Sequence, residues 1–220
     1  MKAGVLHARG DIRYEEIPTP SPGPGQVLIK VMYTGICGSD IPRVNGNASH
    51  YYPNVLGHEF SGVVAEVGDG VKSLKEGDKV AGIPLIPCFK CEDCQKGDYA
   101  LCKHYSFIGS RQFGSFAEYV VVPERNAYKL DDSISFEKGA FFEPITVALH
   151  GLNRLDYKSG GIVAILGGGT IGLFTMQWAK IFGARKVVVF DINDERLQLA
   201  KKLGADECIN TLEEGFIERA

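Results

Sequence analysis

The sequence contains no long apolar run, no excess of basic residues and no repeated or low-complexity segment. Without an apolar run of membrane-spanning length, no transmembrane helix is predicted, and the residues after Met1 lack the apolar core of a signal peptide. A formal net charge of -3, from 24 basic and 27 acidic residues, offers no basic face for nucleic acid. These absences indicate a globular cytoplasmic protein, whose 220 residues suffice for one large or two small domains.

Cysteine is also sparse, but its placement is informative. Four of the six cysteines lie within PCFKCEDCQKGDYALC, with the spacing C-x2-C-x2-C-x7-C, and they are Cys88, Cys91, Cys94 and Cys102. Four thiolates this close together can surround one Zn²⁺ tetrahedrally, as in closed structural zinc sites. A pair of disulfides is the alternative, which we disfavour because nothing else in the sequence indicates a secreted protein.

Residues 1 to about 150 are typical of a lobe rich in short β-strands. Runs of β-branched and other apolar residues, separated by turns that contain glycine and proline, predict strands at 27–31, 62–67, 79–81 and 117–122. We expect a mostly β, barrel-like lobe, followed by a helix over 139–152 that leads out of it.

After a glycine-containing turn at 158–161 the pattern changes to alternating strands and helices. Strands are expected at 162–166, 186–190 and 207–210, and helices at 173–182 and 195–203. This alternation predicts a parallel sheet built from right-handed βαβ units. We therefore classify the fold as mixed α/β and expect one domain over 1–152 and a second over 153–220.

A dinucleotide site is predicted at the first strand–helix turn of the second domain. Gly167, Gly169 and Gly172 form G-x-G-x-x-G, in which the glycines allow the tight turn, the approach of a pyrophosphate and the packing of helix on strand. The N–H groups at the start of the helix face the phosphates. Asp191 ends the next strand, where its carboxylate can accept both ribose hydroxyls and would repel a 2′-phosphate. This favours NAD over NADP, with a helix cap as the alternative role for Asp191.

A second metal site is indicated by three residues that lie far apart in the sequence. Cys37 in CGSD and His58 in GHE supply a thiolate and an imidazole, and Glu143 supplies a carboxylate from an apolar stretch. One thiolate and one carboxylate would neutralise Zn²⁺ and ease its burial. Singly, these residues have ordinary roles as a core thiol, a satisfied histidine and a helix cap, but together they favour a catalytic zinc site with an open position for substrate.

Several motifs resemble the zinc-dependent medium-chain alcohol dehydrogenases. GHEFSG at 57–62, with Gly68 and Val71 after it, resembles their zinc signature, and CGSD, EGDKVAG and the four-cysteine loop extend the similarity over essentially the whole chain. Glu143 in EPITV resembles the polyol branch, which has glutamate where other members have a second cysteine. The resemblance implies a GroES-like first lobe, a partial Rossmann second lobe, and hydride transfer from a polyol or polyol phosphate to NAD.

The resemblance also implies roles for individual residues. Many relatives end a proton relay with a histidine five positions after the residue that matches Cys37, but this chain has Pro42 there, so the proton must leave by another route. Two zinc ions per chain are expected. The implied roles are catalytic zinc ligands for Cys37, His58 and Glu143, an approach to the metal during ligand exchange for Glu59, orientation of the ligand histidine for Asp40, acceptance of the substrate proton for Ser39, and structural zinc ligands for Cys88, Cys91, Cys94 and Cys102.

A polyol phosphate requires a cation near the mouth of the substrate cleft. Arg43 and Arg111 are the candidates, because guanidinium groups pair well with phosphate oxygens. An ordinary solvated surface charge is the alternative for each of them. His50, Tyr51 and Tyr52 are predicted either to line the same cleft or to pack their loop.

The sequence ends at Ala220, soon after the third strand expected in the second domain. Since a doubly wound fold has two halves with the dinucleotide across their junction, we expect a fragment or a truncated gene product. Two hypotheses follow. The first is a polyol dehydrogenase that forms dimers or tetramers at full length, with sorbitol, butanediol and threonine types left open. The second is an inactive zinc-binding module.

Overall fold

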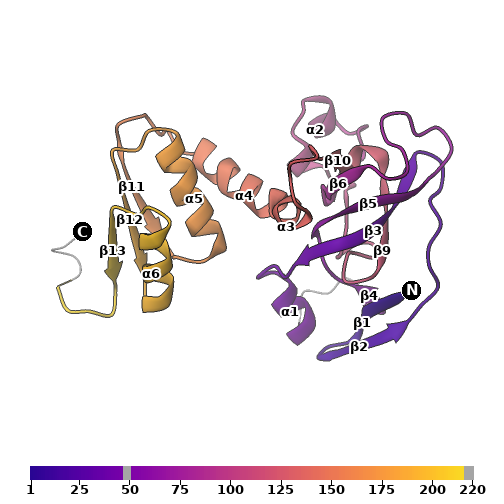
Figure 1. The fold of residues 1–220 in the computed structure, drawn as a ribbon, viewed down its shortest axis with the longest axis horizontal. Helices are drawn as coiled ribbons and strands as arrows, with labels where there is room; N and C mark the ends of the chain where they lie inside the picture. Colours follow the sequence, from indigo (N-terminus) through magenta and orange to yellow (C-terminus); the bar gives the residue numbers. More distant parts are fainter. Residues whose placement is uncertain (47–50, 216–220) are drawn as a thin grey trace. The chain divides into compact units, whose positions relative to one another are not determined.

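The computed structural model describes residues 1–46 and 51–215. The chain divides into two compact units, Met1–Glu143 (unit 1) and Pro144–Ala220 (unit 2), each with its own hydrophobic core (Figure 1). The division falls near the start of helix α4 (Phe142–Asn153), whereas the boundary expected from the sequence lies near the end of the same helix. Unit 1 is built mainly of antiparallel β-strands, and unit 2 is an alternation of parallel strands and helices.

Unit 1 is built on a five-stranded antiparallel sheet in the order β10-β6-β5-β3-β9 (Figure 1). Its strands are β3 (Gln26–Gly35), β5 (Glu59–Val67), β6 (Lys79–Gly82), β9 (Tyr119–Pro123) and β10 (Ala127–Lys129). Since successive side chains in a strand point to opposite faces, alternate residues such as Val27 and Ile29 of β3 enter one core with Phe60 and Val64 of β5. Irregular pairing between β3 and β5 increases the local twist of the sheet.

Smaller elements of unit 1 lie around this sheet. Strands β2 (Asp11–Glu16), β1 (Lys2–Ala8) and β4 (Asn54–Val55) form a second sheet in that order, and β7 (Leu85–Ile86) pairs with β8 (Ser106–Phe107). The β7–β8 pair closes the base of the excursion that carries the four clustered cysteines. The short helices are α1 (Asp40–Asn45), α2 (Glu92–Gln95), α3 (Phe136–Ala140), η1 (Tyr99–Leu101) and η2 (Glu124–Asn126).

Unit 2 contains a parallel sheet in the order β11-β12-β13. Strands β11 (Ile162–Leu166), β12 (Lys186–Asp191) and β13 (Glu207–Asn210) alternate with helices α5 (Thr170–Ile181) and α6 (Asp194–Lys202). Both helices pack on one face of the sheet (Figure 1), where their buried side chains meet those of β11 and β12. The core formed there includes Val163, Ile165, Met176, Ala179, Val187, Val189, Leu197 and Ala200.

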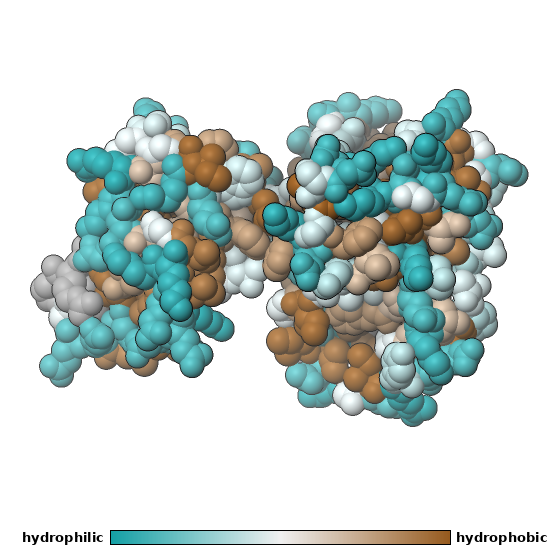
Figure 2. All heavy atoms as spheres, viewed as in Figure 1, coloured by the Kyte–Doolittle hydropathy of each residue, from teal (hydrophilic) through white to brown (hydrophobic). Residues whose placement is uncertain are grey.

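The strands and helices expected from the sequence are present apart from differences at their ends, with one exception. The single helix expected over 139–152 is two helices, α3 and α4, separated at Phe141. Apolar side chains also remain exposed on both units, seen in brown among teal in Figure 2, and Ile36 and Leu166 are among them. Within the described ranges, no helix has the length and apolar character needed to cross a membrane.

Candidate metal centres and dinucleotide site

Three side chains of unit 1 bring potential metal-binding atoms together. Cys37 lies in the turn between β3 and α1, His58 directly precedes β5, and Glu59 begins that strand. One donor atom from each lies within 4.8 Å of the others. Glu143, expected from the sequence as the third ligand, is not part of this compact group. It starts the first turn of α4, where burial and then the charge of Glu59 raise the pKa of Glu143 to about 7.

Asp40 lies next to Cys37 and His58 and is 3% exposed. Its Oδ2 accepts a hydrogen bond from the backbone N–H of Cys37 at 3.0 Å, and its Oδ1 lies 3.7 Å from Nδ1 of His58. Burial raises the pKa of Asp40 and lowers that of His58. Asp40 therefore fixes the Cys37 turn and faces one nitrogen of the His58 ring.

Ser39 and Cys37 are also in contact. Burial raises the pKa of the Cys37 thiol, and hydrogen bonds from the side chain and the backbone N–H of Ser39 oppose this shift. Glu59 is hydrogen-bonded to the same thiol, so the Glu59 carboxylate and the Cys37 thiol are in direct contact. A divalent cation bound here would favour the ionised thiolate and carboxylate over the neutral forms.

The backbone around His58 is tightly enclosed. Gly57 has φ +93°, and a Cβ there would lie 2.5 Å from the Phe116 ring. A Cβ at Gly109 or at Gly114 would clash with the Gly57 carbonyl oxygen. The three glycines thus let the segment 107–116 pack directly on the backbone before His58, and the Phe107 ring lies 5.6 Å from the His58 ring in an edge arrangement.

The two predicted phosphate-binding arginines differ in position. Arg43 donates from Nη1 to the carbonyl oxygen of Ser39 at 2.8 Å, so its guanidinium lies beside the candidate site. Arg111 is exposed and stacks on Tyr105, with its Cζ 4.3 Å from the ring centroid. Tyr51 is partly buried and Tyr52 is exposed. His50 lies outside the described residues.

The four clustered cysteines converge as their spacing predicts. Sγ of Cys88 lies 3.9 Å from that of Cys94, and Sγ of Cys91 lies 3.9 Å from that of Cys102. All four sulfurs lie within 4.8 Å of one another, and none forms a disulfide. The N–H groups of Lys90 and Cys91 lower the pKa of Cys88 to about 6. Burial raises the pKa of Cys94 to about 12. Four free sulfurs in this arrangement match the donor set of a tetrahedral zinc site.

The glycine turn in unit 2 lies between β11 and α5, at the predicted dinucleotide site. Gly167 has φ +108°, a backbone conformation that glycine adopts readily. A Cβ at Gly169, the N-cap of α5, would meet no atom within 4 Å, so the space before the helix is open. A Cβ at Gly172 would clash with the Gly167 carbonyl oxygen, so this glycine permits the close packing of α5 on the turn.

Asp191 is held at the end of β12 by backbone donors. Its Oδ2 accepts from the N–H of Gly168 at 2.7 Å, and its Oδ1 from the N–H of Asn193 at 2.9 Å. Burial alone would raise the pKa of Asp191, but the backbone hydrogen bonds and Arg196 outweigh it and lower the pKa. A hollow of about 330 Å³ lies here, lined by Leu166, Gly167, Phe190, Asp191, Ile192, Arg196 and Thr211. Arg196 and Thr211 were not expected at this site, although a basic residue on the helix after an acidic strand end is a usable signal for Arg196.

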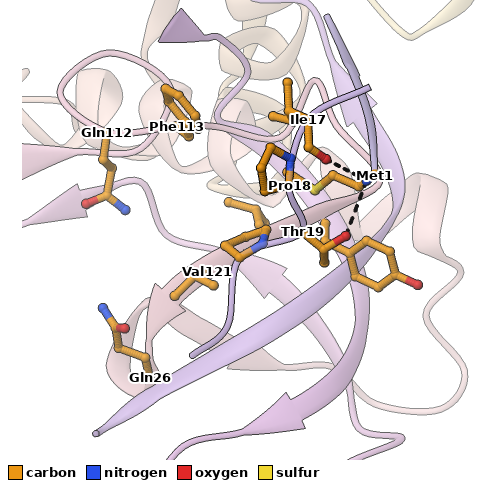
Figure 3. A pocket seen from close by; sticks show the side chains of 11 residues that line it. Met1, Ile17, Pro18, Thr19, Gln26, Gln112, Phe113 and Val121 are labelled. Carbon is orange, nitrogen blue, oxygen red and sulfur yellow. Dashed lines mark hydrogen bonds between the residues drawn. The ribbon is translucent and has the colours of Figure 1, made fainter. Parts of the chain in front are cut away.

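Another cavity, of about 520 Å³, lies in unit 1 (Figure 3). The ammonium group of Met1 donates to the Ile17 carbonyl oxygen at 2.7 Å and to Thr19 Oγ1 at 3.3 Å at its wall. Its lining is mainly apolar and contains none of the predicted site residues.

Two protein-family models match the chain. One describes the alcohol dehydrogenase GroES-like domain and matches residues 23–132, and the other describes a zinc-binding dehydrogenase and matches residues 170–220. The chain belongs to the zinc-dependent medium-chain alcohol dehydrogenase family. Membership of this family accounts for the pairing of a GroES-like lobe with a partial Rossmann lobe.

Individual members of the family are similar over nearly all of this chain. It is 46% identical to galactitol 1-phosphate 5-dehydrogenase of Escherichia coli K12, over 97% of the chain and 62% of that enzyme. It is 39% identical to sorbitol dehydrogenase of Bacillus subtilis, over 99% of the chain and 63% of that enzyme. The chain therefore spans less than two thirds of the length of these curated relatives.

Solved structures of family members agree with this. The crystal structure of the E. coli galactitol-1-phosphate dehydrogenase has a TM-score of 0.93 at 45% identity, covering 98% of this chain and 62% of that one. The crystal structure of a zinc-binding dehydrogenase of Sinorhizobium meliloti 1021, bound to NADP, has a TM-score of 0.96 at 37% identity. The match covers 100% of this chain and 64% of that one.

Proposed function

We propose that this chain belongs to an NAD- and zinc-dependent polyol dehydrogenase that oxidises galactitol 1-phosphate to tagatose 6-phosphate. The observation that carries the proposal is the cluster of Cys37, His58 and Glu59, with the Ser39 hydroxyl and the Arg43 guanidinium beside it. The 46% identity to galactitol 1-phosphate 5-dehydrogenase supports the choice of substrate.

We assign the catalytic zinc to Cys37, His58 and Glu143. Glu59 is the neighbouring carboxylate that would approach the metal during ligand exchange. The four-cysteine loop would hold a second zinc. When bound, the catalytic zinc supplies a Lewis acid that lowers the pKa of the substrate hydroxyl, and NAD accepts the hydride. The residues fit these ions, because thiolate, imidazole and carboxylate groups are the usual zinc ligands.

The protein residues contribute orientation and proton acceptance. Asp40 faces Nδ1 of His58 at 3.7 Å, which leaves Nε2 as the donor atom for a metal. The Ser39 hydroxyl accepts the proton of the substrate alcohol and passes it on by a route that does not use residue 42, because Pro42 has no titratable group.

A phosphate subsite is proposed at Arg43. Its Nη1 is anchored on the Ser39 carbonyl oxygen, so the guanidinium has a defined position close to the proposed proton acceptor. A guanidinium can bind two phosphate oxygens at once, which a lysine ammonium does less well. Arg111, which stacks on Tyr105, is the second candidate for this subsite.

The adenosine half of NAD is assigned to the hollow beside the glycine turn. Gly167, Gly169 and Gly172 would accommodate the pyrophosphate, and Asp191 would accept the ribose hydroxyls. A carboxylate at this position disfavours a 2′-phosphate, so we propose NAD although the S. meliloti relative binds NADP. We further propose a cytoplasmic homo-oligomer, a dimer or a tetramer.

The test is NADH production by the protein as it occurs in its source cells, with galactitol 1-phosphate, galactitol and sorbitol as substrates. The proposal expects the phosphorylated substrate to be preferred, and Arg43→Ala to reduce kcat/KM for it about tenfold or more, with little effect on free galactitol. Arg13→Ala is the matched control, since Arg13 pairs with Asp11 on the surface.

The possible results separate the alternatives. Equal rates on phosphorylated and free galactitol would refute the phosphate assignment and favour a sorbitol or butanediol type of enzyme. No NADH from any polyol, in protein that retains zinc, would favour the inactive zinc-binding module.

A further inference from the structure

Phe89 has an unusual backbone conformation within the four-cysteine loop. It follows Cys88 directly and has φ +58°, the single non-glycine residue with positive φ in the described part of the chain. A bulky L-residue is disfavoured in this left-handed region, which glycine and asparagine usually occupy. The surrounding structure must therefore hold Phe89 in place.

The conformation of Phe89 has a consequence for Cys88. The chain turns back at Phe89, so that the next two N–H groups, of Lys90 and Cys91, point at Sγ of Cys88 at 3.5 and 3.4 Å. N–H groups directed at a sulfur stabilise the thiolate, the form in which cysteine binds a metal. If φ of Phe89 relaxed to negative values, these two donors would turn away from the sulfur.

The Phe89 ring is in contact with two residues outside the turn. The guanidinium of Arg125 lies over its face, with Cζ 4.1 Å from the ring centroid. The Tyr99 ring lies at 5.4 Å between centroids, tilted by 59°, and belongs to η1 just before Cys102. Phe89 thus links the two cysteine-bearing parts of the loop to Arg125 on η2.

Arg125 projects from a well-anchored base. On one side, Glu124 accepts hydrogen bonds from Ser73, through both its N–H and its hydroxyl. On the other side, Asn126 is 2% exposed and donates from Nδ2 to the carbonyl oxygens of Ile83 at 2.7 Å and Leu85 at 2.8 Å. The guanidinium is therefore presented to Phe89 from a segment that both neighbours hold in the body of unit 1.

We propose that Arg125, acting through Phe89, is a positioning residue of the four-cysteine zinc site. Its stack on the ring keeps Phe89 in the left-handed conformation, which in turn keeps the N–H donors on Cys88 and the site pre-formed for metal. This inference rests on the proposed assignment of zinc to Cys88, Cys91, Cys94 and Cys102.

The test compares the effect of Arg125→Ala on zinc release when residue 89 is phenylalanine and when it is glycine. The full chain is used in a Cys37→Ser background, so that zinc taken up by a colorimetric chelator comes from the four-cysteine site. With Phe89 present, we expect Arg125→Ala to speed zinc release about threefold to tenfold. With Phe89→Gly, glycine adopts the left-handed conformation unaided, and Arg125→Ala should change nothing.

Two further variants separate backbone strain and charge. Phe89→Leu retains the strained backbone but loses the aromatic face, so it should release zinc faster than Phe89→Gly. Arg125→Lys keeps the charge but loses the planar stacking group, and it should restore only part of the slow release. Lys90→Ala is the control, because it removes a positive charge from the same loop, and its side chain makes no ion pair or ring contact within the described residues.

Different results would overturn different parts of this reasoning. An equal effect of Arg125→Ala in both backgrounds, or none in either, would refute the role of Arg125 through Phe89. A fall in melting temperature that accounts for the faster release would also refute it, since this would indicate a general structural role. Absence of a thiolate-to-cobalt charge-transfer band in the Co²⁺-loaded parent chain would instead refute the four-cysteine metal site itself.

Discussion

Replacing Gly172 with alanine tests whether the third glycine of the turn is required for packing. A Cβ at this position would clash with the Gly167 carbonyl oxygen and lie 3.2 Å from Cγ2 of Ile165. The clash involves backbone on one side and a core side chain on the other, so α5 must shift. Overpacking of this kind costs about 1–3 kcal/mol. Alanine recovers up to about 1 kcal/mol through its higher helix propensity, so we expect a net loss of up to about 2 kcal/mol.

The loss can be measured in unit 2 alone. Trp178 is the single tryptophan of the chain and lies in α5, where its Nε1 donates to the Ile145 carbonyl oxygen at 3.1 Å. Its fluorescence during urea unfolding therefore reports on unit 2. The midpoint for Gly172→Ala should fall, with the slope of the transition unchanged.

Gly169→Ala is the matched control. It introduces the same methyl group three residues earlier, where φ is -75° and no atom lies within 4 Å of the new Cβ. We expect little change in unfolding but weaker binding of ADP-ribose, because the methyl group occupies the path of the pyrophosphate. An unfolding midpoint for Gly172→Ala equal to that of the parent, or an equal loss in both variants, would refute the packing argument.

Three further predictions concern the candidate sites. Because burial raises the pKa of Glu143 from its ordinary value of 4.5 to about 7, metal-free protein should lose stability as the pH rises through this interval. Chelator-treated Glu143→Gln should lack that decline between about pH 5 and about pH 8 in thermal melts, and a decline of the same size in both proteins would contradict the assignment. Cys37→Ser should lose about half of the bound zinc by elemental analysis, with an unchanged far-UV spectrum, and full zinc content would remove Cys37 from the metal site. Asp191→Ala should weaken ADP-ribose binding about tenfold to hundredfold in calorimetry and reduce discrimination against the 2′-phosphorylated analogue, whereas unchanged affinity would assign Asp191 a purely structural role.

Features that depend on short-range spacing were predictable from the sequence. The cysteine spacing at 88–102 constrains the sulfurs to one small volume, and the structure brings them within 4.8 Å. The glycine spacing at 167–172 likewise corresponds to a strand, a tight turn and the start of α5. In both cases a few consecutive residues determine the geometry.

Features that depend on distant segments were harder to predict. Whether Glu59 or Glu143 lies closer to Cys37 and His58 depends on the three-dimensional position of Glu143, which follows Glu59 by 84 positions and which the spacing along the chain does not encode. The left-handed conformation of Phe89 was not predicted, because the local sequence favours other conformations and the stabilising contact comes from Arg125, 36 positions away. The break at Phe141 was not predicted, although Pro144 is a usable signal for it, because proline is tolerated in the first turn of a helix and not in its interior.

The contact of Gly57, Gly109 and Gly114 limits how new substrate preferences can be obtained by directed evolution. Side chains added at any of these positions would displace the backbone that carries His58, so randomised libraries that include them would consist mostly of proteins in which the candidate metal site is disrupted. Arg111 and Phe113 lie in the same segment and are exposed, so they can vary without this penalty. A library aimed at substrate preference would therefore hold the three glycines constant.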